Sequence, residues 1–122
     1  MNMTKLINLY SKFDTFEDYW SPKVIAEMND YQFKLVKIKG DFVKHQHFET
    51  DEVFIVIEGK MSIEFETETI DINTGEMIVI PKGISHKPFA EEECKVMLVE
   101  LRGIVNTGNV EGDMTVPNDQ WI

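Results

Sequence analysis

Short apolar or alternating runs, separated by turn residues, dominate the chain from residue 24 to residue 101. The clearest runs read VIAEM, YQFKLVKI, EVFIVIEG, MSIEFE, EMIVIPKG and CKVMLVEL. Turn-forming sequences such as Asn-Asp, Asn-Thr-Gly and Pro-Lys-Gly stand between them. Strands that recur about every 8 to 12 residues with turn chemistry between them are typical of a β-sandwich or β-barrel. The pattern therefore predicts an all-β meander.

The two ends of the chain follow other patterns. Residues 1–22 place apolar side chains at near-helical spacing and carry a capping-box sequence at 15–18, so we expect one or two short helical turns against the main body. Residues 102–122 are rich in glycine and asparagine, which predicts an irregular covering tail anchored by Trp121 and Ile122. The expected organisation is a helical covering segment at 1–22, a β-barrel at 23–101 and an irregular tail at 102–122.

The composition is that of one folded domain. The chain has 122 residues, of which 43% are hydrophobic and 28% charged, enough to build a single core. Its one cysteine, Cys94, excludes an intrachain disulfide and suits a reducing compartment, and we expect it to be a small buried hydrophobe. No apolar stretch is long enough for a signal peptide or a membrane span, so the expected location is the cytoplasm.

The net charge of −10 argues against two classes of partner. Nucleic-acid backbones and anionic lipid surfaces are bound through clustered lysine and arginine, and an acidic chain repels both. The densest basic run, Lys34, Lys37 and Lys39, has the spacing of the polar side of a strand or loop. We therefore expect binding to neither nucleic acid nor membrane.

Candidate chemistry gathers around the three histidines of the chain. In an extended strand His45 and His47 point to the same side, about 6 to 7 Å apart, so two imidazoles can share one ion. A short polar turn at 48–51 brings Glu52 back beside them, and His86 follows another apolar run. Taken alone, the His-Gln-His sequence is compatible with both a metal site and a polar strand surface.

The spacing around these residues resembles the first motif of the cupins, a family of small jelly-roll β-barrels. That motif runs glycine, histidine, any residue, histidine, three or four residues, glutamate, six residues and glycine. The matching positions are Gly40, His45, His47, Glu52 and Gly59. Four residues, where the family usually has five, separate the glycine from the first histidine, which predicts a slightly altered start of this strand.

The second cupin motif has a counterpart further along the chain. It runs glycine, five residues, proline, any residue, glycine, two residues, histidine and, later, asparagine. Gly75, Pro81, Gly83 and His86 match it, whereas Ala90 stands where the asparagine is usual. In the family that asparagine is not normally a metal ligand, so its replacement concerns local packing more than an ion.

The resemblance implies a cupin barrel that holds one divalent transition metal through His45, His47, Glu52 and His86. Imidazole and carboxylate ligands are compatible with Fe, Mn, Ni, Zn or Cu, and the sequence does not select among them. Four protein ligands leave two positions of an octahedral ion open for a small-molecule substrate or ligand. Asp51, beside Glu52, either orients a ligand histidine or faces solvent in the turn. No separate catalytic residue is identified.

Three functions are compatible with such a site, because cupins host many unrelated activities. The first is a metalloenzyme of the dioxygenase or oxidoreductase type that acts on a small organic molecule. The second is a sugar isomerase, epimerase or lyase. Lys44, Lys82 and Arg102 are not expected inside the barrel, which counts against a phosphorylated substrate. The third is a non-catalytic module that senses a small molecule or a metal.

An apolar stripe on the run at 52–57 predicts a contact surface. Strand alternation turns Val53, Ile55 and Ile57 away from the barrel interior, and three aligned β-branched residues are too apolar to be left in water. Either aromatic residues of the N-terminal segment cover them or a second copy of the chain does. The aromatic residues are Phe13, Phe16 and Trp20. Because cupins commonly pair, we expect a homodimer.

Overall fold

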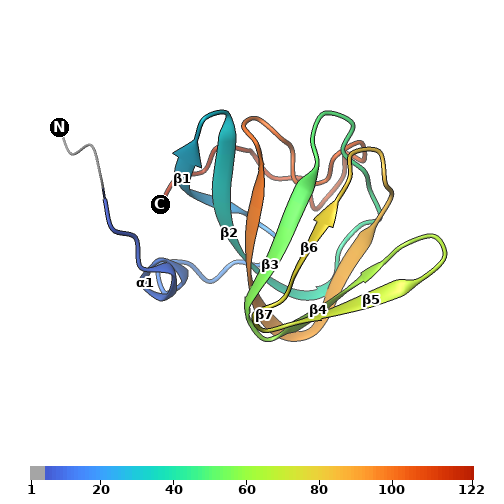
Figure 1. Cartoon of the computed structure of the whole chain (residues 1–122), viewed down its shortest axis with the longest axis horizontal. Helices are drawn as coiled ribbons and strands as arrows, with labels where there is room; N and C mark the ends of the chain where they lie inside the picture. Colours follow the sequence, from blue (N-terminus) through green and yellow to red (C-terminus); the bar gives the residue numbers. More distant parts are fainter. Residues whose placement is uncertain (1–4) are drawn as a thin grey trace.

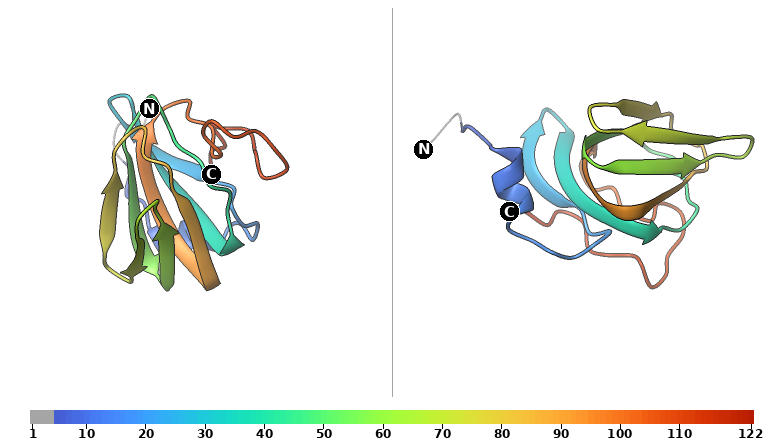
Figure 2. Two further views of the ribbon diagram at one scale, coloured as in Figure 1. Left: turned by 90° about the vertical axis from the view of Figure 1, so that its right-hand side faces the viewer. Right: turned by 90° about the horizontal axis from the view of Figure 1, so that it is seen from below.

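The computed structural model describes residues 5–122, in which one short helix precedes seven strands. The elements are α1 (Leu9–Phe13), β1 (Lys23–Met28), β2 (Tyr31–Asp41), β3 (Glu52–Glu58), β4 (Lys60–Glu64), β5 (Thr69–Asn73), β6 (Met77–Ile80) and β7 (Lys87–Leu101). These strands pair antiparallel in the order β1-β2-β7-β3-β6, while β4 pairs with β7 and β5 (Figure 1). The sheet curls into the jelly-roll barrel that the cupin resemblance implies (Figure 2). The meander predicted from the strand pattern is wrong, because β7 lies between β2 and β3. Within the described residues, no helix is long and apolar enough to cross a membrane.

Strand β2 is buried on both of its faces, which the sequence did not predict. Burial alternates along β3, because successive side chains point to opposite sides of a sheet, but residues 34–38 of β2 are buried without interruption. Lys34 and Lys37 therefore lie in the protein interior and not on a polar strand face. On the outer side, Lys37 Nζ donates a hydrogen bond of 2.7 Å to the carbonyl of Phe16.

The two departures from the cupin motifs meet in space. The register of β2 against β7 shifts between Ile38 and Gly40, and Gly40 then pairs with Ala90. Gly40 has a φ of +80°, a conformation that favours glycine. The end of β2 is therefore irregular where the segment between Gly40 and His45 is one residue shorter than usual in the family. The buried Ala90 lies opposite Gly40 at this point.

Two elements differ from the sequence prediction. The helix α1 begins after Asn8, whose Oδ1 accepts a hydrogen bond of 3.0 Å from Ser11 N–H, and it ends at Phe13. The capping-box sequence at 15–18 therefore does not start a helix. Strand β5 was not predicted, because in its sequence TIDIN only Ile70 and Ile72 are apolar.

Two apolar clusters stabilise the fold, one inside the barrel and one outside it. The barrel cluster consists of Val36, Ile38, Phe54, Val56, Met61, Ile63, Ile72, Ile80, Ala90, Cys94, Val96 and Leu98. In the outer cluster, Phe13 and Phe16 pack with Leu35 and against Ile57, so the N-terminal segment, one of the two alternatives for this face, covers part of it. Trp20 does not cover this face; it packs against the barrel cluster.

The C-terminal tail lies across one side of the barrel (Figure 2). Its end is tied to β1, since Val24 N–H donates to the Gln120 carbonyl at 2.6 Å and Ile122 N–H donates to the Val24 carbonyl at 3.1 Å. Ile122 packs against the outer cluster, whereas Trp121 is 51% exposed. Of the two residues expected to anchor the tail, only Ile122 does so by apolar packing.

Candidate metal centre

Main-chain hydrogen bonds join the two segments that carry the histidines. His45 lies in the segment after β2, and His86 directly precedes β7. His45 N–H donates to the His86 carbonyl at 2.9 Å, and His86 N–H donates to the His45 carbonyl at 2.8 Å. Two residues further on, the His47 carbonyl accepts a hydrogen bond of 2.7 Å from Gly83 N–H. The backbone therefore holds the imidazoles together independently of any ion.

All four residues predicted to bind metal meet at one place. Each of His45, His47, Glu52 and His86 offers a ligand atom that lies within 4.8 Å of the others. Glu52 Oε1 is 3.5 Å from His47 Nε2 and 3.4 Å from His86 Nε2. Two ligand atoms that are each about 2.1 Å from one ion lie roughly 3 to 4.2 Å apart. The four residues could therefore hold one metal ion.

The polar atoms of this cluster have few other partners. In the described part of the chain, His47 Nε2, His86 Nε2 and Glu52 Oε1 are buried without a hydrogen bond. Leaving a polar atom buried and unpaired costs about 1–3 kcal/mol. A divalent cation would satisfy all three atoms at once, so the residues present are compatible with the metal that the cupin motifs imply.

Backbone carbonyls orient two of the imidazole rings. His45 Nδ1 lies 2.9 Å from the Val43 carbonyl, and His86 Nδ1 lies 2.9 Å from the Ile84 carbonyl. Because a carbonyl only accepts hydrogen bonds, Nδ1 carries the proton in both rings and Nε2 keeps its lone pair for a metal. Asp51 has no part in this orientation: it is exposed, and its Oδ1 accepts a hydrogen bond of 2.9 Å from the Lys82 N–H.

The environment keeps the ligands in the protonation states that bind metal. Burial lowers the pKa of His45 to about 4, and the neighbouring His86 adds to the shift. The imidazole is then neutral at pH 7, as ligation requires. Burial of Glu52 opposes ionisation, but its contacts with His47 and His86 outweigh burial and lower its pKa below the usual range. The cluster therefore presents a carboxylate and a neutral imidazole.

The lowered pKa of His45 predicts acid sensitivity of the metal-free protein. Below about pH 6.5 the unfolded chain binds a proton at this histidine, whereas the folded chain does so only below about pH 4. Between these values the unfolded state holds more protons, so the free energy of unfolding should decrease as the pH is lowered. This residue should contribute up to about 1.4 kcal/mol per pH unit. Urea titrations of the chelated protein between about pH 6.5 and 4.5 measure this slope. His45→Gln should flatten it, and an unchanged slope in that variant would contradict the shifted pKa.

A mostly apolar cavity of ≈ 40 Å³ opens beside the metal cluster. His45 and Glu52 both line it. Its walls come from inward-facing strand residues and from the C-terminal tail. The apolar lining includes Val36, Ile38, Phe42, Phe54, Leu98 and Ile104. A bound small molecule would thus lie between the metal ligands and the tail.

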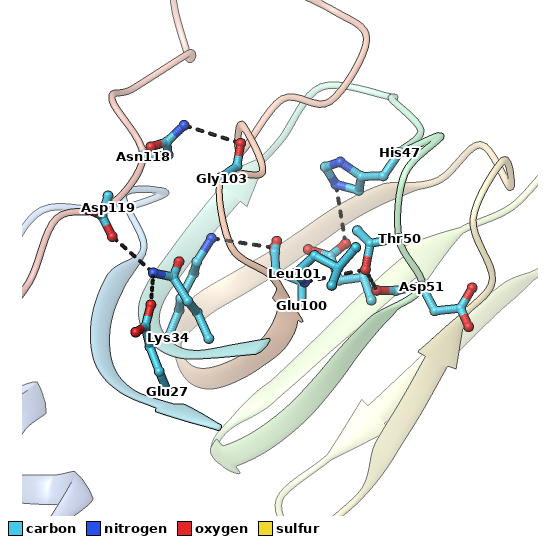
Figure 3. Close-up of polar contacts among 12 residues, drawn as sticks. Glu27, Lys34, His47, Thr50, Asp51, Glu100, Leu101, Gly103, Asn118 and Asp119 are labelled. Atoms are coloured by element: carbon cyan, nitrogen blue, oxygen red, sulfur yellow. Dashed lines mark hydrogen bonds and ion pairs between the residues drawn. The ribbon is translucent and has the colours of Figure 1, made fainter. Parts of the chain in front are cut away.

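The cavity is also lined by a buried ion pair that was not predicted from the sequence. Lys34 Nζ, from β2, lies 3.7 Å from Glu100 Oε2, from β7, and their side chains are only 4% and 3% exposed (Figure 3). Burial raises the pKa of Glu100, the nearby Glu52 charge raises it further, and Lys34 opposes the shift. The available signal was strand alternation, because Lys34 lies on the same face of β2 as the inward-facing Val36.

The tail fits closely against the segment that carries the ligands. Asn109 N–H donates to the Gln46 carbonyl at 3.1 Å, and Gln46 N–H donates to Asn109 Oδ1 at 2.9 Å. Gly108 has a φ of +57°, and a Cβ atom there would collide with the Gln46 carbonyl and lie 3.1 Å from His45 Cδ2. Glycine is therefore needed at this position. The tail is part of the site and not a loose extension.

The comparisons with known proteins agree with this structure. Residues 34–100 match the family model of the cupin domain. The chain belongs to the cupin family. A cupin-2 domain containing protein from Shewanella frigidimarina NCIMB 400 is 60% identical with a TM-score of 0.79, over 80% of this cupin and 95% of that chain. The uncharacterised protein YdbB of Bacillus subtilis (strain 168) is 33% identical over 86 residues, which cover 70% of this cupin and 76% of the relative.

A more distant structure has the same fold. Hydroquinone 1,2-dioxygenase PnpCD, solved in complex with Cd²⁺ and 4-hydroxybenzonitrile, has a TM-score of 0.69 at 14% sequence identity. The similarity covers 79% of this cupin and 72% of that chain. At this level of identity the comparison shows the fold alone.

Other candidate residues are not among the four members of the metal cluster of this cupin. Cys94 is completely buried in the barrel cluster, and burial raises the pKa of its thiol to about 11, so it is an inert small hydrophobe as predicted. Lys44 and Lys82 are exposed. Arg102 Nε donates to Glu27 Oε2 at 2.8 Å on the surface.

Proposed function

We propose that this cupin binds one divalent transition metal through His45, His47, Glu52 and His86 and is an enzyme of the dioxygenase or oxidoreductase type. Its substrate would be a small organic molecule bound in the barrel cavity. The observation that carries the proposal is that His45 and Glu52 are members of the ligand cluster and also line the cavity. Structural metal sites are closed, whereas catalytic sites keep positions open for a substrate.

The residues of the chain have defined tasks in this proposal. When bound, the metal supplies Lewis acidity and, if it is redox-active, electron transfer with dioxygen. The carbonyls of Val43 and Ile84 keep the rings of His45 and His86 in one orientation. Glu52 compensates part of the charge of the ion. The apolar walls exclude water from the substrate, which strengthens the electrostatic interactions inside the cavity.

Oxygenase chemistry is the first candidate because the ligand set and the cavity suit a redox metal and an organic substrate. Three imidazoles and one carboxylate accommodate iron, manganese, nickel or copper as well as zinc. A protein of the same fold, hydroquinone 1,2-dioxygenase PnpCD, is a dioxygenase, which supports the proposal at the level of the fold alone.

Loading the protein with different metals tests this function. In an oxygen electrode, the Fe(II) form should consume dioxygen with some member of a panel of small organic acids, phenols and diketones. The Zn(II) form should not, because zinc has no redox chemistry. Turnover by the Zn(II) form without dioxygen would contradict the oxygenase proposal. Saturable binding with no turnover under any metal would indicate a sensor in place of an enzyme.

A second function is favoured by the Lys34–Glu100 pair. An ammonium and a carboxyl group beside a metal are the groups that general acid and base catalysis needs, as in an isomerase or a lyase. The expected lack of basic groups inside the barrel is wrong, because Lys34 lines the cavity. Under this function, several divalent ions should support turnover in the absence of dioxygen.

A further inference from the structure

The Lys34–Glu100 pair is poorly explained by folding alone. Its atoms Nζ and Oε2 are 3.7 Å apart, longer than a direct hydrogen bond, although both side chains are almost fully buried. Within residues 5–122, Glu100 Oε2 has no hydrogen-bond partner. A buried ion pair recovers its desolvation cost only with close contact and additional hydrogen bonds. Both groups are therefore in a position to bind something else in the cavity.

The charges around the cavity favour an anion once a divalent metal is bound. Neutral imidazoles and the Glu52 carboxylate leave one positive charge on such a centre, and Lys34 adds positive charge beside Glu100, whose ionisation is opposed by burial and by the nearby Glu52. The remaining charged residue of the lining, Asp119, is exposed and accepts hydrogen bonds from Gln32 and Trp121. A buried excess charge is costly without a counter-ion. A negatively charged ligand would offset this charge.

The unpaired acceptor on Glu100 adds a second requirement. A simple carboxylate ligand would leave Glu100 Oε2 without a donor, whereas a hydroxyl group of the ligand could donate a hydrogen bond to it. The cavity of ≈ 40 Å³ has room for about three water molecules at roughly 10–15 Å³ each. The ligand that satisfies both groups in this space is therefore small.

We propose that Lys34 and Glu100 recognise a small hydroxy acid. The Lys34 ammonium donates to the carboxylate of the ligand, and Glu100 accepts from its hydroxyl group. The side chains of Val36 and Leu98 provide the apolar wall beside them. The inference rests on the proposed metal function and names the substrate class of that site.

Binding of glycolate, acetate and inorganic phosphate to the Co(II) form tests the inference, with visible absorption and calorimetry as readouts. Wild type should bind glycolate about tenfold more tightly than acetate or phosphate. Lys34→Met should weaken glycolate binding about tenfold or more, because it removes a charge-assisted hydrogen bond. Glu100→Leu, which removes the acceptor, should abolish the preference for glycolate over acetate. Lys44→Met, which removes the same charge from an exposed position next to His45, should bind glycolate like wild type.

A double variant separates recognition from stability. Lys34→Met with Glu100→Leu replaces the pair by apolar groups, which is often neutral or stabilising. It should melt no lower than wild type and still fail to bind glycolate. Glycolate binding by Lys34→Met within about twofold of wild type, at equal cobalt content, would overturn the inference, as would tighter binding of phosphate or no binding of glycolate by wild type. Absence of cobalt from wild type would overturn the metal function and this inference with it.

Discussion

Replacing His86 by alanine should reduce the metal content of the protein from about one ion per chain to about a tenth of that or less. His86 is 1% exposed, and its Nε2 lies 3.4 Å from Glu52 Oε1 at the centre of the cluster. Loss of a residue that only orients a metal ligand already costs roughly 10–100-fold in affinity, so loss of a direct ligand should cost more. Elemental analysis after dialysis against equimolar metal measures the effect.

Two controls distinguish loss of a ligand from loss of the fold. Lys87→Ala changes the adjacent residue, whose side chain is 32% exposed, and should keep its metal. Chelation of wild type should lower the melting temperature without unfolding the protein, because the two apolar clusters described above include none of the four ligands. Equal metal content in wild type and His86→Ala would contradict the assigned site.

The arrangement of the ligands follows from local rules that can be applied to a sequence. The alternation of an extended chain places His45 and His47 on one side, and after a short turn Glu52 begins β3, which β7 separates from β2. Which distant strand end completes the cluster is not a local property. The cupin motif predicted that His86 belongs to the cluster. In the structure, the paired backbones of residues 45 and 86 hold it there.

Burial that depends on segments distant in the sequence could not be predicted in the same way. Lys34 and Lys37 look like surface residues, because a hydrophobic pattern does not reveal that β2 is covered on both faces. Trp20 was expected on the outer face, but its indole stacks on Phe42 with ring centroids 4.7 Å apart beside the cavity. The tail has no periodic pattern, so its hydrogen bonds to the ligand segment were not foreseeable either.

We expect a homodimer of about 28 kDa, twice the chain mass of 14.2 kDa, and Ile55→Asp should convert it into monomers. Ile55 and Val53 are only partly buried on the outer face of β3, where they pair with Met77 and Val79 of β6. Met77 and Val79 are 57% and 51% exposed. These four residues form a continuous apolar patch on the sheet that the N-terminal segment leaves uncovered, since its aromatic residues reach only Ile57.

The patch is suited to a second copy of the same chain. Two chains that each carry a net charge of −10 repel one another unless they meet through an uncharged surface, and these four side chains carry no charge. A sheet face can pack against its symmetry mate about a twofold axis, so that each copy buries the same residues. The charge of an aspartate at position 55 would then be buried opposite its own copy, which is strongly unfavourable.

Light scattering at micromolar concentration distinguishes the two states. Val110→Asp introduces the same charge at an apolar tail residue that is 37% exposed and lies outside the patch, so this variant should remain a dimer. Circular dichroism should show the wild-type fold for Ile55→Asp, because the side chain at this position points away from the barrel core. A wild-type mass of about 14 kDa would show that the patch has no partner copy. A dimer that persists in Ile55→Asp would place the interface on another face.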